Sequence, residues 1–333
     1  MKSVIIGAGI AGITAAKTIK EIDKDAEVVV IGDEMFLPYK RYLLTELLCG
    51  LSAQDDLLFL PLELLNKLDI KLRIGETVKA IEPSKKLITL HHNETMHYDK
   101  LLIATGCIPS LGLTLRPYKN YIQNYYSLND ILVLKKRVPE IQKCIVFGKG
   151  VSCLDLISGL YNLGKQIIYI TKGKRAHFGL KESEFKDTLH DFLEEKGIDI
   201  ITEDRIVSID TSKHGYRADT LRQKKITADI IFGWDHYNPN ISCVENTSIE
   251  KRLGILVNAQ LETSEKDIYA AGNCMEIYNP FLKKYWFNFG LPNALEQGRV
   301  AGKNMLGQEE EYKIHETITF NLMGKSLKAR WWR

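Results

Sequence analysis

The feature that most constrains the fold is an apolar run near the N-terminus that ends in three closely spaced glycines. The pattern Gly-x-Gly-x-x-Gly occupies residues 7–12, and a helical pattern and a second apolar run at 27–31 follow it. This order predicts a strand, a tight turn, a helix and a parallel strand. Gly7 permits the turn, Gly9 lets the backbone approach a pyrophosphate, and Gly12 lets the helix pack closely on the strand. The pattern therefore predicts a dinucleotide site.

A second unit of the same kind begins near residue 144. Its turn keeps two of the three glycines, Gly148 and Gly150, whereas Cys153 replaces the third. A helical pattern and an apolar strand at 166–170 follow. Two such units in succession predict an α/β fold with two Rossmann-like dinucleotide-binding domains.

The residues after the second strand differ in charge between the two units. Asp33 and Glu34 follow the strand of the first unit, in the position from which an acid holds a ribose hydroxyl. In the second unit Thr171 and Lys172 stand there, with further cations at 174–175. Two interpretations remain open for the second unit: a nucleotide site whose cations suit a 2′-phosphate, or a structural unit that has lost its ligand.

Composition narrows the class of protein. The 333 residues, of which 45% are hydrophobic and 26% charged, suit about two globular domains. The net charge of +3 without a basic stripe gives no indication of nucleic-acid binding, and no apolar run reaches the roughly 18 residues that span a bilayer. The six cysteines are scattered without a Cys-x-x-Cys pair. That pattern indicates a reducing compartment, which we take as the cytoplasm, and no metal cluster.

Taken together, these motifs resemble the two-dinucleotide-binding-domain flavoproteins, which form the pyridine nucleotide–disulfide oxidoreductase family. The resemblance is greatest to the rubredoxin reductase and ferredoxin reductase branch, covers about residues 1–320, and implies a glutathione-reductase-like fold. It is carried by the first glycine motif and by five further segments: 31–34, 38–41, 104–106, 267–273 and 297–299.

The resemblance implies FAD on the first unit and NADH or NADPH on the second. It divides the chain into an FAD-binding domain at 1–112 and 245–312, an NAD(P)H-binding domain at 113–244, and a C-terminal tail at 313–333. Only the first strand of the relatives' third, interface domain is expected here, near 315–322. The chain is then either a natural short form or a fragment.

By the same resemblance, fifteen residues are expected to contact FAD: Gly7, Gly9, Ala11, Gly12, Asp33, Glu34, Arg41, Val78, Ala104, Thr105, Gly106, Gly272, Asn273, Leu291 and Pro292. Four are expected to contact the pyridine nucleotide: Gly148, Gly150, Thr171 and Lys172. Arg41 would lie at the pyrophosphate and Val78 at the adenine. A helix that begins at Pro292 would direct its positive N-terminal end at the flavin.

Departures from the family pattern affect the expected chemistry. The redox-active cysteines of disulfide-reducing and peroxide-reducing relatives have no counterpart here, which argues against thiol chemistry. Glu46 and Asp155 stand where relatives place a lysine and a glutamate beside the flavin. We expect this catalytic-site pair to bring two carboxylates together and to raise one pKa. Asn273 replaces an aspartate, so a charge-assisted hydrogen bond is lost there.

Two functions fit these observations. The first is an FAD-dependent NAD(P)H oxidoreductase that passes electrons to a small carrier protein such as rubredoxin or ferredoxin. The alternative is a non-catalytic or accessory FAD-binding subunit of a larger redox complex, which the incomplete second glycine turn favours. The basic segment at 325–333, with four cations and two tryptophans, is a candidate docking site for an acidic carrier. It could equally pack on the FAD-binding domain or be the edge of a lost domain.

Overall fold

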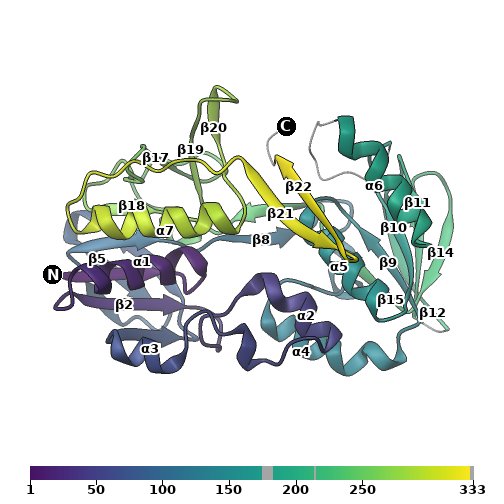
Figure 1. Ribbon diagram of the computed structural model, residues 1–333, viewed down its shortest axis with the longest axis horizontal. Helices are drawn as coiled ribbons and strands as arrows, with labels where there is room; N and C mark the ends of the chain where they lie inside the picture. Colours follow the sequence, from purple (N-terminus) through teal and green to yellow (C-terminus); the bar gives the residue numbers. More distant parts are fainter. Residues whose placement is uncertain (175–182, 214, 331–333) are drawn as a thin grey trace. The chain divides into compact units, whose positions relative to one another are not determined.

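The computed structural model describes residues 1–174, 183–213 and 215–330, which form two compact units (Figure 1). The first unit gathers three stretches of the chain: 1–40, 58–108 and 238–315. The second unit gathers the remaining three: 41–57, 109–237 and the chain from 316 onward. The expected division into FAD-binding and nucleotide-binding domains remains a proposal, and the segment 41–57 belongs to the second unit.

A five-stranded parallel sheet forms the centre of the first unit, in the order β18-β7-β1-β2-β3. Its strands are β1 (Lys2–Ile6), β2 (Glu27–Gly32), β3 (Ile70–Ile74), β7 (Lys100–Ile103) and β18 (Ile268–Ala270). Val4, Ile5 and Leu102 are fully buried, as expected for continuous apolar strands covered on both faces. The expected strand, turn, helix and strand at the N-terminus are therefore present.

Two long helices of the first unit pack against each other: α1 (Ile10–Ile22) and α7 (Leu291–Met305) (Figure 1). Glycines on α7 allow this close approach. A methyl group on Gly298 would lie 2.3 Å from the carbonyl oxygen of Ala11, and one on Gly302 would lie 2.8 Å from that of Ala15. Small residues thus allow the two helices to pack closely. The first residue of α7 is one position before the expected Pro292.

Smaller elements complete the first unit. They are the helix α3 (Leu62–Lys67), the antiparallel sheet of β4 (Val78–Glu82), β5 (Leu87–Leu90) and β6 (Thr95–His97), and the mixed sheet of β17 (Ile255–Val257), β19 (Met275–Asn279) and β20 (Lys284–Trp286). Two of the five places where the chain passes between the units lie in β8 (Cys107–Ser110) and β16 (His236–Pro239).

The second unit is built on a four-stranded parallel sheet in the order β11-β10-β9-β15. The strands are β9 (Lys143–Phe147), β10 (Gln166–Ile170), β11 (Asp199–Ile201) and β15 (Ile230–Gly233). The α-helices in the described part of this unit are α2 (Leu44–Cys49), α4 (Leu128–Arg137), α5 (Val151–Asn162) and α6 (Ser183–Glu195). A meander of β12 (Ile206–Ser212), β13 (Gly215–Thr220) and β14 (Lys225–Ala228) lies between β11 and β15 in the chain. Among the described helices of the protein, none is both long and apolar enough to cross a bilayer.

The C-terminal segment forms a hairpin of β21 (Thr317–Leu322) and β22 (Lys325–Arg330). The backbone N–H of Met323 donates to Ser158 Oγ of α5 at 3.0 Å, and Leu322 and Leu327 are buried. The described part of the tail therefore packs on the second unit, and its proposed role as a docking site stays a prediction. The two tryptophans and the last arginine, at 331–333, lie outside the described residues.

Candidate functional site

The first glycine turn combines two positions that the fold requires with one that it leaves open. Gly7 has a φ of +114°, and a methyl group there would lie 2.2 Å from the carbonyl oxygen of Ala104. A methyl group on Gly12 would lie 2.0 Å from the carbonyl oxygen of Gly7. On Gly9 it would meet no atom within 4 Å. Because Gly9 borders space at the N-terminus of α1, the turn fits the close approach of a pyrophosphate such as that of FAD.

The segment after β7 lies beside this turn and is fixed by hydrogen bonds. The backbone N–H of Ala104 donates to Ile6 O at 2.7 Å. Thr105 Oγ1 donates to Asn240 O, and Asn240 N–H donates to Gly106 O at 2.9 Å. The predicted residues 104–106 are therefore held at the carboxyl end of the parallel sheet, where ligands bind in open α/β folds.

A buried glutamine joins two segments that the sequence predicted separately. Gln297 on α7 is fully buried, and its Oε1 accepts from the backbone N–H of Gly272 at 2.7 Å. Its Nε2 donates to Asn288 O at 3.3 Å and to the Tyr312 hydroxyl at 3.2 Å. The turn at Gly272 and Asn273 is thereby tied to α7, the helix that begins with Leu291 and Pro292. Sequence reasoning did not assign this role to Gln297.

The remaining predicted FAD contacts are placed as follows. Asp33 is exposed directly after β2, and Glu34 accepts a hydrogen bond from the Tyr39 hydroxyl at 2.8 Å. Val78 is buried at the start of β4. Arg41 lies in the second unit, with its guanidinium 4.3 Å from the centre of the Tyr126 ring and a hydrogen bond to Tyr126 O. Their contacts with a cofactor stay predictions.

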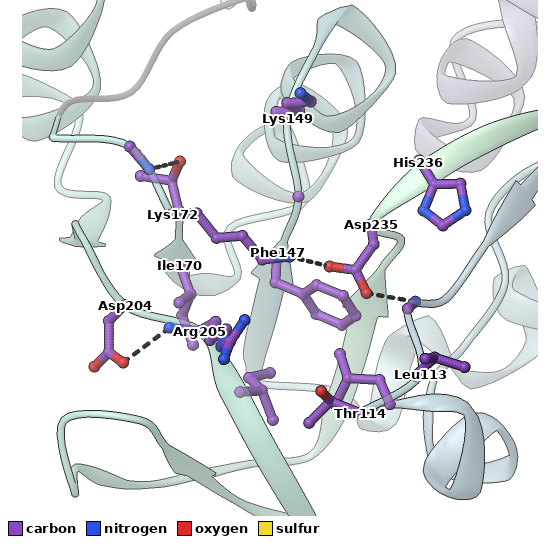
Figure 2. Close-up of a pocket in the computed structure, with 16 residues that line it drawn as sticks. Leu113, Thr114, Phe147, Lys149, Ile170, Lys172, Asp204, Arg205, Asp235 and His236 are labelled. Carbon is purple, nitrogen blue, oxygen red and sulfur yellow. Dashed lines mark hydrogen bonds and ion pairs between the residues drawn. The ribbon is translucent and has the colours of Figure 1, made fainter.

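A cavity of about 550 Å³ opens in the second unit at the carboxyl ends of its parallel strands (Figure 2). Its lining combines Phe147 and Ile170 with the polar residues Lys172, Arg205 and Asp235. Such a crevice at strand ends is where doubly wound sheets bind nucleotides. Sequence reasoning missed Arg205 and Asp235, which lie just before β12 and just after β15.

The glycine turn of the second unit repeats the arrangement of the first. Gly148 has a φ of +125°, and a methyl group there would lie 2.7 Å from Trp234 O. On Gly150, at the N-terminus of α5, it would meet nothing within 4 Å. Cys153, in place of the third glycine, is fully buried, and burial raises its pKa to about 12. The substitution therefore leaves the open position at Gly150 intact.

Two of the predicted nucleotide contacts follow β10. Thr171 is buried, and its hydroxyl accepts from the backbone N–H of Gly173 at 3.3 Å. Lys172 Nζ donates to Asp235 Oδ1 at 2.5 Å, so its charge is already paired. Lys174 is exposed, whereas the cation expected at 175 lies outside the described residues.

Glu46 and Asp155 differ in their surroundings. Thr45 Oγ1 of α2 donates to Asp155 Oδ2 on α5 and also bonds with the Tyr125 hydroxyl. The pKa of Asp155 is raised to about 6: burial is the main cause, the charge of Glu46 adds to it, and the Thr45 bond acts against both. Glu46 is exposed and accepts from Ser52 Oγ at 2.9 Å. One raised pKa is thus present, as expected, but the two carboxylates are not buried together.

The cysteines lack the surroundings of reactive thiols. Burial, together with the nearby charges of Asp155 and Glu46, raises the pKa of Cys49 to about 11. Burial also raises the pKa of Cys144 and of Cys243 to about 12. Because the thiolate is the nucleophile, these groups are poorly suited to disulfide exchange.

The fold and the two glycine turns define a dinucleotide-binding protein with two α/β units. The profile of the family described as Pyridine nucleotide-disulphide oxidoreductase matches residues 1–301, and the chain belongs to this family. Membership confirms the expected oxidoreductase class, with FAD and NADH or NADPH as its cofactors.

Individual relatives agree with this assignment. The chain is 31% identical over 315 residues to NADH-rubredoxin oxidoreductase of Clostridium acetobutylicum, covering 93% of this chain and 76% of that protein. It is 29% identical over 317 residues to the Assimilatory nitrate reductase electron transfer subunit of Bacillus subtilis, covering 93% of this chain and 40% of that protein. The crystal structure of a covalent putidaredoxin reductase–putidaredoxin complex matches with a TM-score of 0.90 at 20% identity, over 98% of this chain and 80% of that chain. That likeness confirms the predicted fold.

Proposed function

We propose that this protein is an FAD-dependent NAD(P)H oxidoreductase that passes electrons to a small carrier protein such as rubredoxin or ferredoxin. One observation carries the proposal: each unit has a glycine turn whose middle glycine, Gly9 or Gly150, borders open space at a helix N-terminus. Two sites built to accept phosphates suit a donor nucleotide and a bound dinucleotide cofactor in one chain. The likeness to a relative named for NADH and rubredoxin supports the choice of donor and acceptor.

The first unit is proposed as the FAD-binding domain. Bound FAD would supply hydride acceptance and stepwise release of single electrons, which suits a one-electron carrier. The chain's part is to hold and orient it. The N-terminus of α1 would face the pyrophosphate, Asp33 and Glu34 would bind ribose hydroxyls, and the turn at Gly272, fixed by Gln297, would contact the ribityl chain.

The second unit is proposed as the NAD(P)H-binding domain. Its cavity lies beside Gly148 and Gly150, and the first turn of α5 contains no acidic residue that would repel a phosphate. The surroundings of Asp155 suit a carboxyl that holds its proton close to neutral pH. We propose Glu46 and Asp155 as the acidic pair of the catalytic site.

The proposed location is the cytoplasm. All six cysteines are free thiols, which is typical of proteins in a reducing compartment.

The test uses the full chain, purified without added flavin. We expect a yellow protein with about one FAD per chain, and reduction of rubredoxin or ferredoxin that depends on NADH or NADPH. A small dye as acceptor is the control for carrier recognition. If the protein binds FAD but reduces neither dye nor carrier, the accessory-subunit alternative gains support, to which the relative named as an electron transfer subunit already lends weight. A protein that cannot be loaded with FAD contradicts both.

A further inference from the structure

Two residues that line the cavity of the second unit, Lys172 and Asp235, form an ion pair. Lys172 follows β10 and Asp235 follows β15, while β9 lies between these strands in the sheet. Their bond, Lys172 Nζ to Asp235 Oδ1 at 2.5 Å, therefore spans the carboxyl end of β9. Figure 2 shows the lysine side chain reaching across Phe147 toward the carboxylate.

The two partners are held with different rigidity. The Asp235 side chain is 12% exposed, and its Oδ2 accepts from the backbone N–H of Gly112 at 2.7 Å. Burial alone would raise the pKa of Asp235, but the bonds from Lys172 and Gly112 bring the pKa below its usual value, so it stays ionised at neutral pH. The Lys172 side chain is 61% exposed. Asp235 is thus a fixed anion, and Lys172 is the arm that can move.

The position of Lys172 matches the place where NADH and NADPH differ. In dinucleotide-binding folds the residue after the second strand contacts the 2′ position of the adenosine ribose, and an acid there selects against a 2′-phosphate. The second strand of this unit is β10, and the residue after it is the neutral Thr171. Lys172 is therefore the first charged side chain that a 2′-phosphate would meet.

We propose that Lys172 exchanges its partner, from Asp235 in the free protein to the 2′-phosphate of NADPH, and that Asp235 thereby sets the preference between NADPH and NADH. This inference rests on the proposed nucleotide-binding function of the second unit. Asp235 acts in two ways: it competes with the phosphate for Lys172, and it adds a negative charge to the same cavity.

The exchange has a cost and a gain. Asp235 is only 12% exposed, so its charge loses stabilisation when Lys172 leaves, although the bond from the Gly112 N–H remains. A phosphate offers more negative charge and three acceptor oxygens, which form stronger charge-assisted hydrogen bonds. NADH has no such group, so the Lys172–Asp235 pair would persist with NADH bound.

The test measures binding of ADP-ribose and of 2′-phospho-ADP-ribose to the FAD-loaded full chain by calorimetry, because neither probe can reduce the flavin. The variants are Lys172→Met, Asp235→Asn and the double variant. Asn keeps an oxygen for the Gly112 N–H and removes the charge. Lys225→Met, on exposed β14 outside the cavity, is the matched control for loss of one positive charge.

We expect Lys172→Met to weaken the binding of 2′-phospho-ADP-ribose about tenfold and to change the binding of ADP-ribose little. Lys225→Met should change the binding of neither probe. Asp235→Asn should tighten the binding of 2′-phospho-ADP-ribose several-fold, and most of this gain should vanish in the double variant. Equal effects of Lys172→Met on both probes, or a full gain from Asp235→Asn without Lys172, would overturn the exchange. Absence of binding by either probe to the unaltered protein would instead refute the nucleotide-binding function itself.

Discussion

Replacing Gly9 by valine should remove FAD while leaving the protein folded. Gly9 has φ −75° and ψ −178°, an extended conformation that valine adopts readily, and a methyl group there meets no atom within 4 Å. The valine side chain would occupy the space through which a pyrophosphate approaches the free N–H groups of α1. Loss of about two hydrogen bonds to a charged group, each worth about 1.5–3 kcal/mol, lowers the affinity for FAD by about a hundredfold or more.

Gly7→Ala provides the contrast, because this position is constrained by the fold. Its φ of +114° and the 2.2 Å approach to Ala104 O make alanine strained whether or not a cofactor binds. Left-handed strain of about 1–2 kcal/mol and overpacking of about 1–3 kcal/mol together predict a loss of about 2–5 kcal/mol in the free energy of unfolding.

The assay compares flavin content after gel filtration, FAD affinity on reconstitution, and urea unfolding of the FAD-free proteins. The Gly9→Val protein should unfold within about 1 kcal/mol of the unaltered FAD-free protein and retain no flavin. If it keeps FAD at normal affinity, the assignment of the first glycine turn is refuted. If it unfolds as easily as the Gly7→Ala protein, Gly9 is required for folding, which contradicts the interpretation that the space beside Gly9 is kept open for the cofactor.

Three further outcomes follow from buried groups. The pKa of Asp155 in the folded protein is raised to about 6. The contribution of its neutral form to the free energy of unfolding is therefore complete below about pH 4, and it is lost as the pH rises through about 6. Urea unfolding should therefore show Asp155→Asn gaining about 2 kcal/mol over the unaltered protein at about pH 8 and nothing at about pH 4; an equal gain at both pH values contradicts the buried ionisation. Gln297→Ala should cost about 1–3 kcal/mol in urea unfolding, because it removes a fully buried side chain and leaves the part-buried N–H of Gly272 without its acceptor; a change below about 0.5 kcal/mol would show that the turn does not depend on this bond. The six thiols should react slowly with a thiol reagent in the native protein and rapidly after denaturation. A thiol that reacts rapidly in the native protein would instead support a reaction that uses a cysteine.

The glycine turns and the helix starts could be predicted from the sequence, because each of them is determined by residues that are close together in the chain. The turn at 7–12 predicts a strand and helix through glycine positions alone, and the observed φ of Gly7 and the open space at Gly9 agree with the roles given to them. The start of α7 was predicted at Pro292, because proline in a first helical turn loses no hydrogen bond, and it lies at Leu291, one residue earlier.

Features that depend on the order of strands could not be predicted in this way. Lys172 and Asp235 are 63 residues apart, and they meet only because β9 separates β10 from β15 in the sheet. The placement of the tail was left open for the same reason: its described part lies on α5, through Met323 and Ser158, and its basic composition carried no signal of that contact. The exposure of Glu46 depends on its position on the short helix α2, which the resemblance alone did not reveal.

The most direct test of the proposed function is anaerobic rapid mixing of the purified, FAD-loaded protein with NADH and, separately, with NADPH. The flavin absorbance near 450 nm should bleach within about a second at saturating nucleotide, with either nucleotide or with both, and it should return when oxidised rubredoxin or ferredoxin is added. The Gly9→Val protein serves as the flavin-free control. Flavin that stays oxidised for minutes with both nucleotides would contradict the account, because a nucleotide-dependent oxidoreductase must transfer the hydride faster than that.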